Sequence, residues 1–354
     1  MSVQRVFDAG FQDPGAIVIE CLTMTKRRLN QQQRRRITEQ QQTYDPASSM
    51  DGLVVCHYGQ QLDVESLDSA HQGQIFRCFQ RSNLPALVTG DRVLWRPETE
   101  NAAENRGVIV AQKPRHAVMS RPNNRGELRA IAANVDCVAV VIAPQPEPFG
   151  NLIDRYLVAI EHLDLRPVIL LNKADLLDTN NKVAALLERY KRIGYETLRV
   201  SSKAGDGMDG LKEALKGQTA VFVGQSGVGK SSLINTLRGV SADDEEFAEV
   251  GALSVAQAKG THTTTATRLY HLPGSGDLID SPGIREFGLW HISADELTAG
   301  FREFRPYAGQ CRFRDCRHQH EPDCALRAAA AKGEIDPARL ESYHYILTSL
   351  EEQG

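Results

Sequence analysis

In Gly224-Gln225-Ser226-Gly227-Val228-Gly229-Lys230-Ser231 the chain carries the pattern G-x-x-x-x-G-K-[ST] of a phosphate-binding loop. An apolar strand over 221–223 precedes this loop, and a helix over 232–237 is predicted to follow it. The glycines allow the backbone to wrap closely around phosphates, so that its N–H groups point inward at the head of the helix. We expect the loop and Ser232 to bind a nucleotide, with Lys230 reaching its β- and γ-phosphates and Ser231 ligating Mg²⁺.

The segments that lead to this loop alternate between apolar strands and amphipathic helices. We expect strands over 137–143, 168–171, 197–200 and 220–223. We expect helices between them over 151–165, 183–192 and 211–215. This alternation predicts a parallel sheet covered by helices on both faces.

The nucleotide base is indicated by Asn172-Lys173-Ala174-Asp175, which directly follows the strand over 168–171. This tetrapeptide resembles the N-K-x-D guanine-recognition motif of GTPases. Asp175 can accept hydrogen bonds from both the ring N–H and the exocyclic amine of guanine, a pairing that adenine cannot offer. The loop that closes the next strand resembles the accessory base-binding loop and comprises Ser201, Ser202 and Lys203.

Two further elements follow the phosphate loop. Asp280-Ser281-Pro282-Gly283 resembles the D-x-x-G element, in which Asp280 holds Mg²⁺ and the Gly283 N–H senses the γ-phosphate. The Gly/Thr-rich stretch 260–265 is expected to supply the switch threonine on Mg²⁺, with Thr264 as our choice. The acidic, Gly/Ala-rich segment 241–260 before it is expected to be mobile, as a switch loop should be.

The sequence does not clearly indicate which residue would orient a water molecule that attacks the γ-phosphate. Many GTPases place a glutamine directly after the D-x-x-G element, but this chain has Ile284 there. His262 in the threonine-rich stretch is the nearest candidate in kind. The alternative is that His262 only packs or is solvated.

These motifs stand in an unusual order along the chain. The base motif at 172–175 precedes the phosphate loop at 224–231, whereas ordinary GTPases have the reverse order. This order predicts a circular permutation, which domains tolerate because their termini often lie close together at the surface.

A cysteine-rich cluster lies near the C-terminus. It has the spacing Cys311-x₄-Cys316-x-His318-x₅-Cys324. Three thiolates and one imidazole predict a tetrahedral, structural Cys₃His zinc site. Two alternatives stay open: His320 competes with His318 as ligand, or the cysteines are free in a basic loop.

Arginines flank this cluster, and helices follow it. The arginines are Arg302, Arg305, Arg312, Arg314 and Arg317. Helices are predicted over 324–332 and 337–350. Because the segment 291–330 is rich in Arg and short of large apolar residues, we expect zinc ligation to supply much of its ordering energy.

The N-terminal part of the chain predicts contacts with nucleic acid. Residues 24–42 hold six Lys and Arg residues against one acid, which indicates a flexible cationic arm, although a solubilising tail is the alternative. Five short strands are predicted over 53–55, 62–64, 75–79, 92–95 and 107–110. They suit an OB-fold barrel, whose surface commonly binds oligonucleotides, although a β-domain without that affinity is also compatible with them.

Composition places the chain among globular proteins. Its 354 residues carry a formal net charge of −4, with 41% hydrophobic and 24% charged residues, which excludes disordered and collagen-like chains. The longest apolar run, 135–143, is about half of the ~18 residues that a membrane-spanning helix needs. Seven cysteines without a signal peptide indicate a reducing compartment, so we expect a cytoplasmic protein without a disulfide framework.

Together these motifs resemble one family, the circularly permuted GTPases that assist assembly of the small ribosomal subunit in bacteria (ribosome small subunit-dependent GTPase A). The resemblance covers about residues 24–354 and implies a multidomain fold: an N-terminal OB-fold β-barrel, a central circularly permuted α/β P-loop GTPase domain and a C-terminal, mostly helical zinc-binding domain. The expected divisions are an upstream extension of uncertain status (1–23, if Met24 is the start), the basic arm (24–49), the barrel (50–114), the GTPase domain (115–287) and the zinc-binding domain (288–354).

The resemblance also implies a function. It implies a monomeric GTP hydrolase that uses magnesium with GTP and one structural zinc. This protein would bind the 30S subunit and its 16S rRNA, assist late maturation and leave after hydrolysis that the subunit stimulates. A nucleotide-gated RNA-binding module with incidental hydrolysis is the main alternative, and a small-molecule phosphotransferase is disfavoured by the motif at 172–175.

Overall fold

The computed structural model describes residues 49–58, 61–98, 105–123, 126–177, 182–240, 267–281, 289 and 292–352. The expected extension over 1–23, the basic arm up to residue 48 and the segment 241–260 lie outside the described residues. The same holds for His262, Thr264, Gly283 and Ile284.

The first five strands form a closed barrel and confirm the predicted OB-fold. They are β1 (Met50–Tyr58), β2 (Gln61–Ser66), β3 (Ile75–Gln80), β4 (Arg92–Pro97) and β5 (Arg106–Gln112). Their order is β1-β2-β3-β5-β4, and pairing of β4 with β1 closes the barrel. Alternate side chains point inward, and Trp95 is fully buried with its ring 4.4 Å from that of Phe76. The barrel therefore has an apolar core of its own.

The central sheet confirms the predicted parallel arrangement. Five parallel strands, β10 (Glu196–Arg199), β9 (Arg166–Leu171), β8 (Cys137–Ile142), β11 (Thr219–Val223) and β13 (Asp277–Asp280), lie side by side in this order. An antiparallel strand, β12 (Thr267–His271), follows β13. All six residues of β8 are buried, which explains why its sequence is apolar without alternation.

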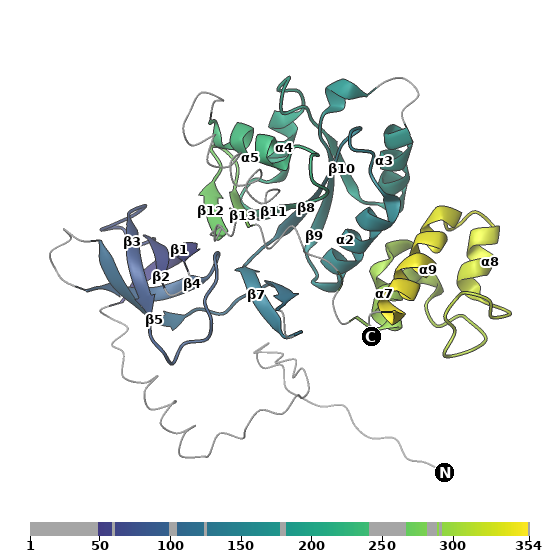
Figure 1. Ribbon diagram of the computed structural model, residues 1–354, viewed down its shortest axis with the longest axis horizontal. Helices are drawn as coiled ribbons and strands as arrows, with labels where there is room; N and C mark the ends of the chain where they lie inside the picture. Colours follow the sequence, from purple (N-terminus) through teal and green to yellow (C-terminus); the bar gives the residue numbers. More distant parts are fainter. Residues whose placement is uncertain are drawn as a thin grey trace, which may run out of the picture. The chain divides into compact units, whose positions relative to one another are not determined.

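Helices cover both faces of this sheet (Figure 1). On one face, Val138 and Val140 of β8 share a core with α2 (Gly150–His162) and α3 (Lys182–Ile193). On the other face, Ala139 and Val141 share a core with α4 (Met208–Ala214) and α5 (Lys230–Arg238). Each of these helices overlaps a predicted one, and within the described ranges none is long and apolar enough to cross a membrane.

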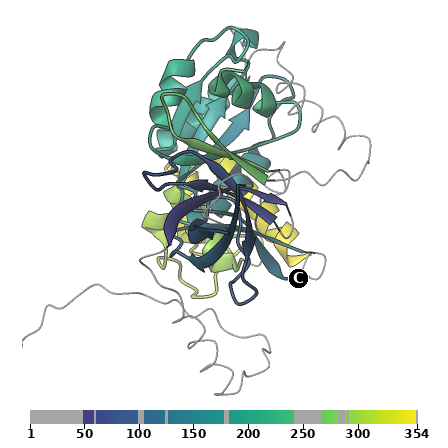
Figure 2. The same cartoon turned by 90° about the vertical axis from the view of Figure 1, so that its left-hand side faces the viewer.

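Two features of the sheets were not predicted from the sequence. Strand β12 pairs with β1 of the barrel, so that the barrel and the central sheet form one eleven-stranded sheet (Figure 2). In addition, β6 (Val118–Pro122) and β7 (Leu128–Ala133) form a separate antiparallel hairpin between the barrel and β8.

The C-terminal region is mostly helical, as predicted. It contains α7 (Ala294–Gly300), the 3₁₀ segment η5 (Arg302–Tyr307), α8 (Ala325–Ala331) and α9 (Pro337–Glu351). The expectation that 291–330 is short of large apolar residues is wrong, because Leu297, Phe301 and Phe304 lie in it and are completely buried. The two Phe rings stack 4.7 Å apart in the core that also includes α2, so this region has packing energy besides any metal ligation.

A buried ionic cluster connects α9 to the central domain. The Arg339 side chain is 1% exposed and pairs with Asp154 of α2, while its Nε lies 2.6 Å from Glu303 Oε1. The Tyr190 hydroxyl of α3 donates to Asp154 at 2.6 Å. Burial raises the pKa of Tyr190 well above its ordinary value, and the negative charge of Asp154 raises it further. This hydroxyl therefore keeps its proton.

Arg339→Met is expected to lower the free energy of unfolding by about 3–5 kcal/mol, because it leaves the buried carboxylate of Asp154 without its cation. Denaturant titration of the full-length protein measures this change. The matched control is Arg312→Met. The side chains of Arg312 and of its partner Asp323 are each 65% exposed, so this ion pair should contribute less than about 1 kcal/mol. Equal losses in the two variants would contradict the prediction.

Candidate functional site

Three loops meet where neighbouring parallel strands of the central sheet end. Asn172 directly follows β9, Ser201 lies two residues after the end of β10, and Gly224 directly follows β11. Because carboxyl ends of parallel strands lie at one edge of a sheet, these loops are close in space. The structure thereby brings together the predicted phosphate loop, base motif and accessory loop, which comprise 224–232, 172–175 and 201–203.

The phosphate loop joins β11 to α5 and requires glycine at two positions. Gly224 has φ of +139°, and a Cβ atom there would lie 2.2 Å from the carbonyl oxygen of Val141. Gly229 has φ of +91°, and a Cβ atom there would lie 2.4 Å from the amide nitrogen of Asn172. The loop thus packs its backbone against the adjacent strand and the base motif, and it leads into the N-terminus of α5, which suits an anion.

Lys230 and Ser231 stand in the first turn of α5. Lys230 Nζ donates to the carbonyl oxygens of Gly224, at 2.7 Å, and Gln225, at 2.6 Å. The ammonium group therefore lies along the loop, where a phosphate bound by the loop would meet it.

Asn172 is fully buried and connects all three loops. Its Nδ2 donates to the carbonyl of Val228 in the phosphate loop at 2.9 Å. Its Oδ1 accepts from the backbone N–H of Ser202 in the accessory loop at 3.2 Å. The Asn of the predicted base motif thus has a structural role in this arrangement.

Lys173 and Asp175 extend the same contacts toward solvent. Lys173 takes a left-handed conformation, and its Nζ donates to the carbonyls of Gln145, at 2.9 Å, and Gly227, at 2.7 Å. The exposed Asp175 accepts at Oδ1 from the Ser201 hydroxyl at 2.6 Å. Ser201 therefore fixes the orientation of this carboxylate. Gln145, in the loop after β8, contributes the carbonyl that accepts from Lys173, and no sequence signal identified this residue.

Asp280 ends β13, the strand that pairs with β11 beside the phosphate loop. The next residue, Ser281, accepts at its hydroxyl oxygen from Thr267 Oγ1 at 2.8 Å. The remaining predicted switch residues, Thr264, Gly283 and His262, lie outside the described residues.

The predicted metal ligands converge in the C-terminal region. The ligand atoms of Cys311, Cys316, His318 and Cys324 all lie within 4.8 Å of one another, so the cluster could hold a metal ion. His318 Nδ1 lies 3.5 Å from the sulfurs of Cys311 and Cys316 and 3.4 Å from that of Cys324. His320 is not a member of the cluster, so the geometry favours His318 over His320 as the ligand.

Burial affects the protonation of this cluster. It raises the pKa of the Cys316 thiol to about 12 and lowers the pKa of the His318 imidazole. The Cys316 thiol is therefore protonated at neutral pH without a cation, and a metal that binds here must displace that proton. The imidazole is neutral and ready to ligate.

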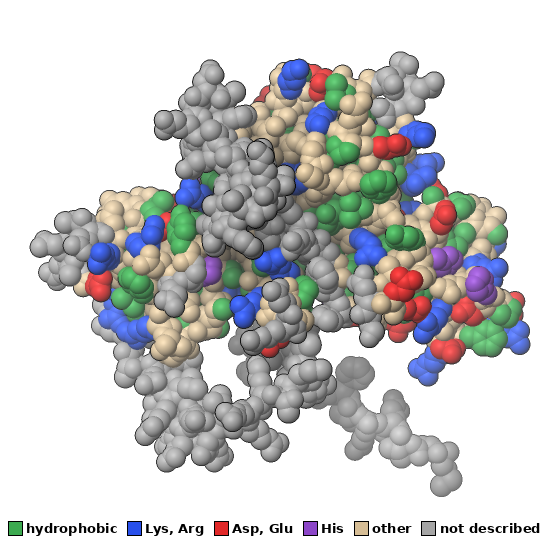
Figure 3. Space-filling model, in the orientation of Figure 1, with side chains coloured by type: hydrophobic (Ala, Val, Ile, Leu, Met, Phe, Trp, Pro, Cys, Tyr) green, Lys and Arg blue, Asp and Glu red, His purple; other side chains and the backbone are tan. Residues whose placement is uncertain are grey.

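The arginines that flank the cluster are largely balanced by carboxylates. Arg302 and Arg305 both bond to Glu161, whereas Arg312 pairs with Asp323 and Arg317 with Glu351. Figure 3 accordingly shows basic and acidic side chains interspersed over this region. The local surface is less cationic than the sequence of this segment indicated.

Comparison with known proteins identifies relatives along nearly the whole chain. A model of the RsgA GTPase family matches residues 112–290. The small ribosomal subunit biogenesis GTPase RsgA of Ectopseudomonas mendocina (strain ymp) is 56% identical over 304 residues, which cover 85% of this chain and 86% of that protein. The protein of the same name from Marinobacter nauticus (strain ATCC 700491 / DSM 11845 / VT8) is 50% identical over 352 residues and covers 93% and 98%.

Solved structures agree with this assignment. The crystal structure of YjeQ from Thermotoga maritima superposes with a TM-score of 0.67 at 31% identity and covers 85% of this chain and 98% of its own. The structure of YloQ, a circularly permuted GTPase, gives a TM-score of 0.66 at 26% identity, with 88% and 99% covered. The chain therefore belongs to the RsgA GTPase family, and it is a circularly permuted hydrolase of GTP.

Proposed function

We propose that this GTPase binds the small (30S) ribosomal subunit and couples GTP hydrolysis to late subunit maturation and to its own release. The subunit stimulates hydrolysis, and the protein acts as a monomer in the cytoplasm. The names of the curated relatives support the biological setting. The single observation that best supports GTP binding at this site is the buried amide of Asn172. This residue of the guanine motif connects the phosphate loop to the accessory loop.

In this proposal, each loop of the site has one task. The backbone of 224–232 and Lys230 hold the phosphates, while Asp175 and the loop 201–203 recognise guanine. Ser231 and Thr264 would hold Mg²⁺, with Asp280 acting through water and the Gly283 N–H sensing the γ-phosphate. Bound Mg²⁺ supplies positive charge that offsets the charge of the phosphate oxygens. His262 is the candidate for orienting the attacking water.

The Cys₃His cluster fits a structural zinc ion. Tetrahedral zinc separates a sulfur from a nitrogen ligand by about 3.5 Å and two sulfurs by about 3.8 Å. The observed sulfur–nitrogen distances are 3.4–3.5 Å, and Cys311 Sγ lies 4.0 Å from Cys324 Sγ. With all four ligands from the protein, the ion would stabilise the loop over 311–324 and take no part in hydrolysis.

The outer face of the barrel offers a surface for RNA. The exposed Arg77 and Phe79 of β3 lie opposite Arg106 and Val108 of β5, and Val108 lies opposite Arg96 of β4. Phe79 is 42% exposed, so its ring is open to solvent. One exposed aromatic ring among arginines on an OB-fold, of which Arg77 also pairs with Asp63, suits the stacking of a base and contacts with phosphates.

Asp175→Asn is expected to lower GTP affinity by about 1–3 kcal/mol, because an amide presents a donor to guanine's own donors. Binding should shift toward XTP, whose 2-oxo group accepts from an amide. Fluorescence titration with both nucleotides measures the preference, and Asp209→Asn, an exposed acid on α4, is the control. An unchanged preference for GTP over XTP in Asp175→Asn would refute guanine recognition by this carboxylate.

Cys316→Ser is expected to lose the metal and to make 311–324 sensitive to protease. Nucleotide binding should persist, because Phe301 and Phe304 still anchor the region to the central core. Metal analysis and limited proteolysis check both results, with about one zinc ion per chain expected in the unmodified protein. His320→Ala should retain the ion, so metal loss in that variant, or zinc-free native protein, would count against the site.

The rate of GTP hydrolysis should rise by orders of magnitude when saturating 30S subunits are added, as it does for GTPases whose partner completes the site. His262→Ala should lose most of this stimulation and keep GTP binding, whereas Ile284→Ala should change it little. A rate that is unaffected by 30S subunits, with nucleotide-dependent subunit binding intact, would instead favour a nucleotide-gated RNA-binding module.

The same assay tests the RNA surface of the barrel. Phe79→Ala should raise the subunit concentration required for half-maximal stimulation, because base stacking contributes about 1–3 kcal/mol. Phe149→Ala removes another exposed ring, located directly before α2 rather than on a barrel strand, and should leave that concentration unchanged. Equal changes of this concentration in the two variants would contradict RNA binding by this face of the barrel.

A further inference from the structure

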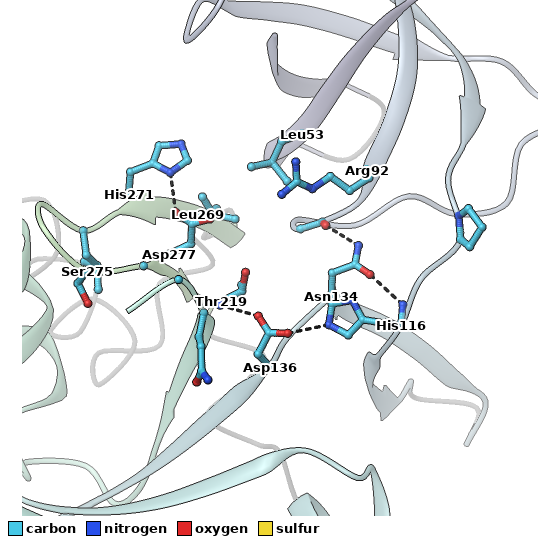
Figure 4. A pocket seen from close by; sticks show the side chains of 16 residues that line it. Leu53, Arg92, His116, Asn134, Asp136, Thr219, Leu269, His271, Ser275 and Asp277 are labelled. Atoms are coloured by element: carbon cyan, nitrogen blue, oxygen red, sulfur yellow. Dashed lines mark hydrogen bonds and ion pairs between the residues drawn. The ribbon is translucent and has the colours of Figure 1, made fainter. Parts of the chain in front are cut away.

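The polar cavity between the barrel and the central sheet has a volume of about 560 Å³ and is lined by side chains that bond to one another (Figure 4). His271 of β12 lies 2.6 Å from Asp277 and 2.5 Å from Glu65 of the barrel. His116 lies 3.0 Å from Asp136. The carboxylates at this junction therefore bond to histidines and connect one element of the fold to another.

Glu321 of the C-terminal region bonds instead to the backbone that precedes it. Its Oε1 accepts from the Arg317 N–H at 2.9 Å. Its Oε2 accepts from the N–H groups of Gln319, at 2.9 Å, and His320, at 3.0 Å. This one carboxylate therefore closes residues 317–321 into a turn, which we call the histidine turn.

The same hydrogen bonds keep the Glu321 carboxylate ionised. Partial burial opposes the charge, but the N–H groups of Arg317, of Glu321 itself, and of His320 and Gln319 together lower the pKa of Glu321 to about 2. Hydrogen bonds from backbone N–H groups to a charged oxygen are stronger than those to a neutral one. At neutral pH the histidine turn is thus closed by a charge.

His318, in the middle of this turn, has a backbone conformation that needs support. Its φ is +63°, in the left-handed region, which costs a non-glycine residue free energy unless the surrounding structure holds it. Its carbonyl oxygen accepts from His344 Nε2 of α9 at 2.7 Å, and the carbonyl oxygen of Glu321 accepts from Arg327 Nη1 of α8 at 3.1 Å. The histidine turn is therefore attached to both helices that follow it.

These contacts join protein groups only, and they place the His318 ring within the cysteine cluster. His318 Nδ1 lies 3.4–3.5 Å from the sulfurs of Cys311, Cys316 and Cys324. The backbone of the histidine turn thereby determines where the nitrogen ligand of the cluster lies.

The other end of the metal loop is attached by longer contacts. The Arg312 N–H donates to the carbonyl oxygen of Asp323 at 3.3 Å, and the Ala325 N–H donates to Cys311 Sγ at 3.4 Å. The side chains of Arg312 and Asp323 also form an ion pair, but both are exposed. We therefore expect the stretch 311–316 to depend on a metal ion more than the histidine turn does.

We infer that Glu321 and His344 are positioning residues of the metal site, which hold the histidine turn in the conformation that presents His318 to the three cysteine sulfurs. The inference rests on the proposed zinc site and concerns how this chain prepares its own ligand. A ligand that is held in place loses less conformational freedom when the ion binds, so these two residues raise the affinity for the ion.

Zinc affinity of the full-length protein, measured by competition with a chromogenic chelator, tests this role. Glu321→Ala should weaken zinc binding roughly 10- to 100-fold, as loss of an outer-shell partner of a metal ligand typically does. His344→Phe keeps an aromatic ring, removes the donor and should weaken binding roughly 3- to 10-fold. The matched control is Glu334→Ala, which removes an exposed carboxylate of the same region, bonded to the Tyr307 hydroxyl at 3.0 Å. This control should leave the affinity within about 2-fold.

A second readout does not require the ion. In Cys316→Ser, trypsin should cut after Arg312 faster than after Arg317, because the bond after Arg317 lies in the histidine turn. Adding Glu321→Ala should raise the rate of cleavage after Arg317, and mass spectrometry of the fragments identifies each cut.

Unchanged zinc affinity in Glu321→Ala, or an equal loss in Glu334→Ala, would overturn the inference. A loss of GTP binding together with zinc binding in Glu321→Ala would indicate general unfolding and would equally contradict a positioning role. If Glu321→Ala fails to fold, Glu321→Gln tests the same point, because its amide turns an NH₂ group toward backbone donors and should also weaken zinc binding. Unmodified protein that binds no zinc would instead refute the proposed metal site.

Discussion

The buried amide of Asn172 is the interaction on which the proposed nucleotide site depends. A buried amide that lacks partners is costly, and here both ends are bonded, one to the phosphate loop and one to the accessory loop. It can bridge them because β9 and β11 flank β8 in one parallel sheet and end at the same edge. The proposed guanine motif thus has two parts: Asn172 connects the loops, and Asp175 is exposed with its orientation fixed by Ser201.

The C-terminal region is integrated with the central domain more deeply than a metal-held appendage would be. Its aromatic residues join the core beneath α2, and Arg339 places a buried cation between Asp154 and Glu303. The circular permutation makes this possible, because β13 is the last strand of the sheet along the chain and α7 is the next element among the described residues. A metal at the Cys₃His cluster would then stabilise one loop on a scaffold that is already packed.

The sequence predicts the parts of this protein that depend on neighbours along the chain. The phosphate loop, Asn172–Asp175 and the cysteine spacing are local patterns, and the strands of the barrel and the sheet follow from local hydrophobicity. The sequence does not reveal pairing between distant segments, so it does not predict the β1–β12 contact. The hairpin of β6 and β7 is local, but few of its residues are buried and they do not alternate clearly, so it lacks a strong strand pattern. The sequence also does not reveal the burial of Leu297, Phe301 and Phe304, because this burial depends on packing with α2 and α9. His318 and His320 differ only in three-dimensional geometry, which no spacing rule contains.

The pairing of β1 with β12 also affects solubility. An edge strand offers unpaired N–H and C=O groups to other chains, and β12 would be such an edge in an isolated GTPase sheet. The barrel pairs with the start of β12, at Thr267 and Arg268, and it has no open edge of its own because β4 pairs with β1. Among the described strands of the large sheet, β10 is left as an edge, and it is short and carries Glu196 and Arg199. The barrel therefore acts as a built-in cap that protects the catalytic sheet from self-association, and a GTPase domain expressed without it would expose an aggregation-prone strand.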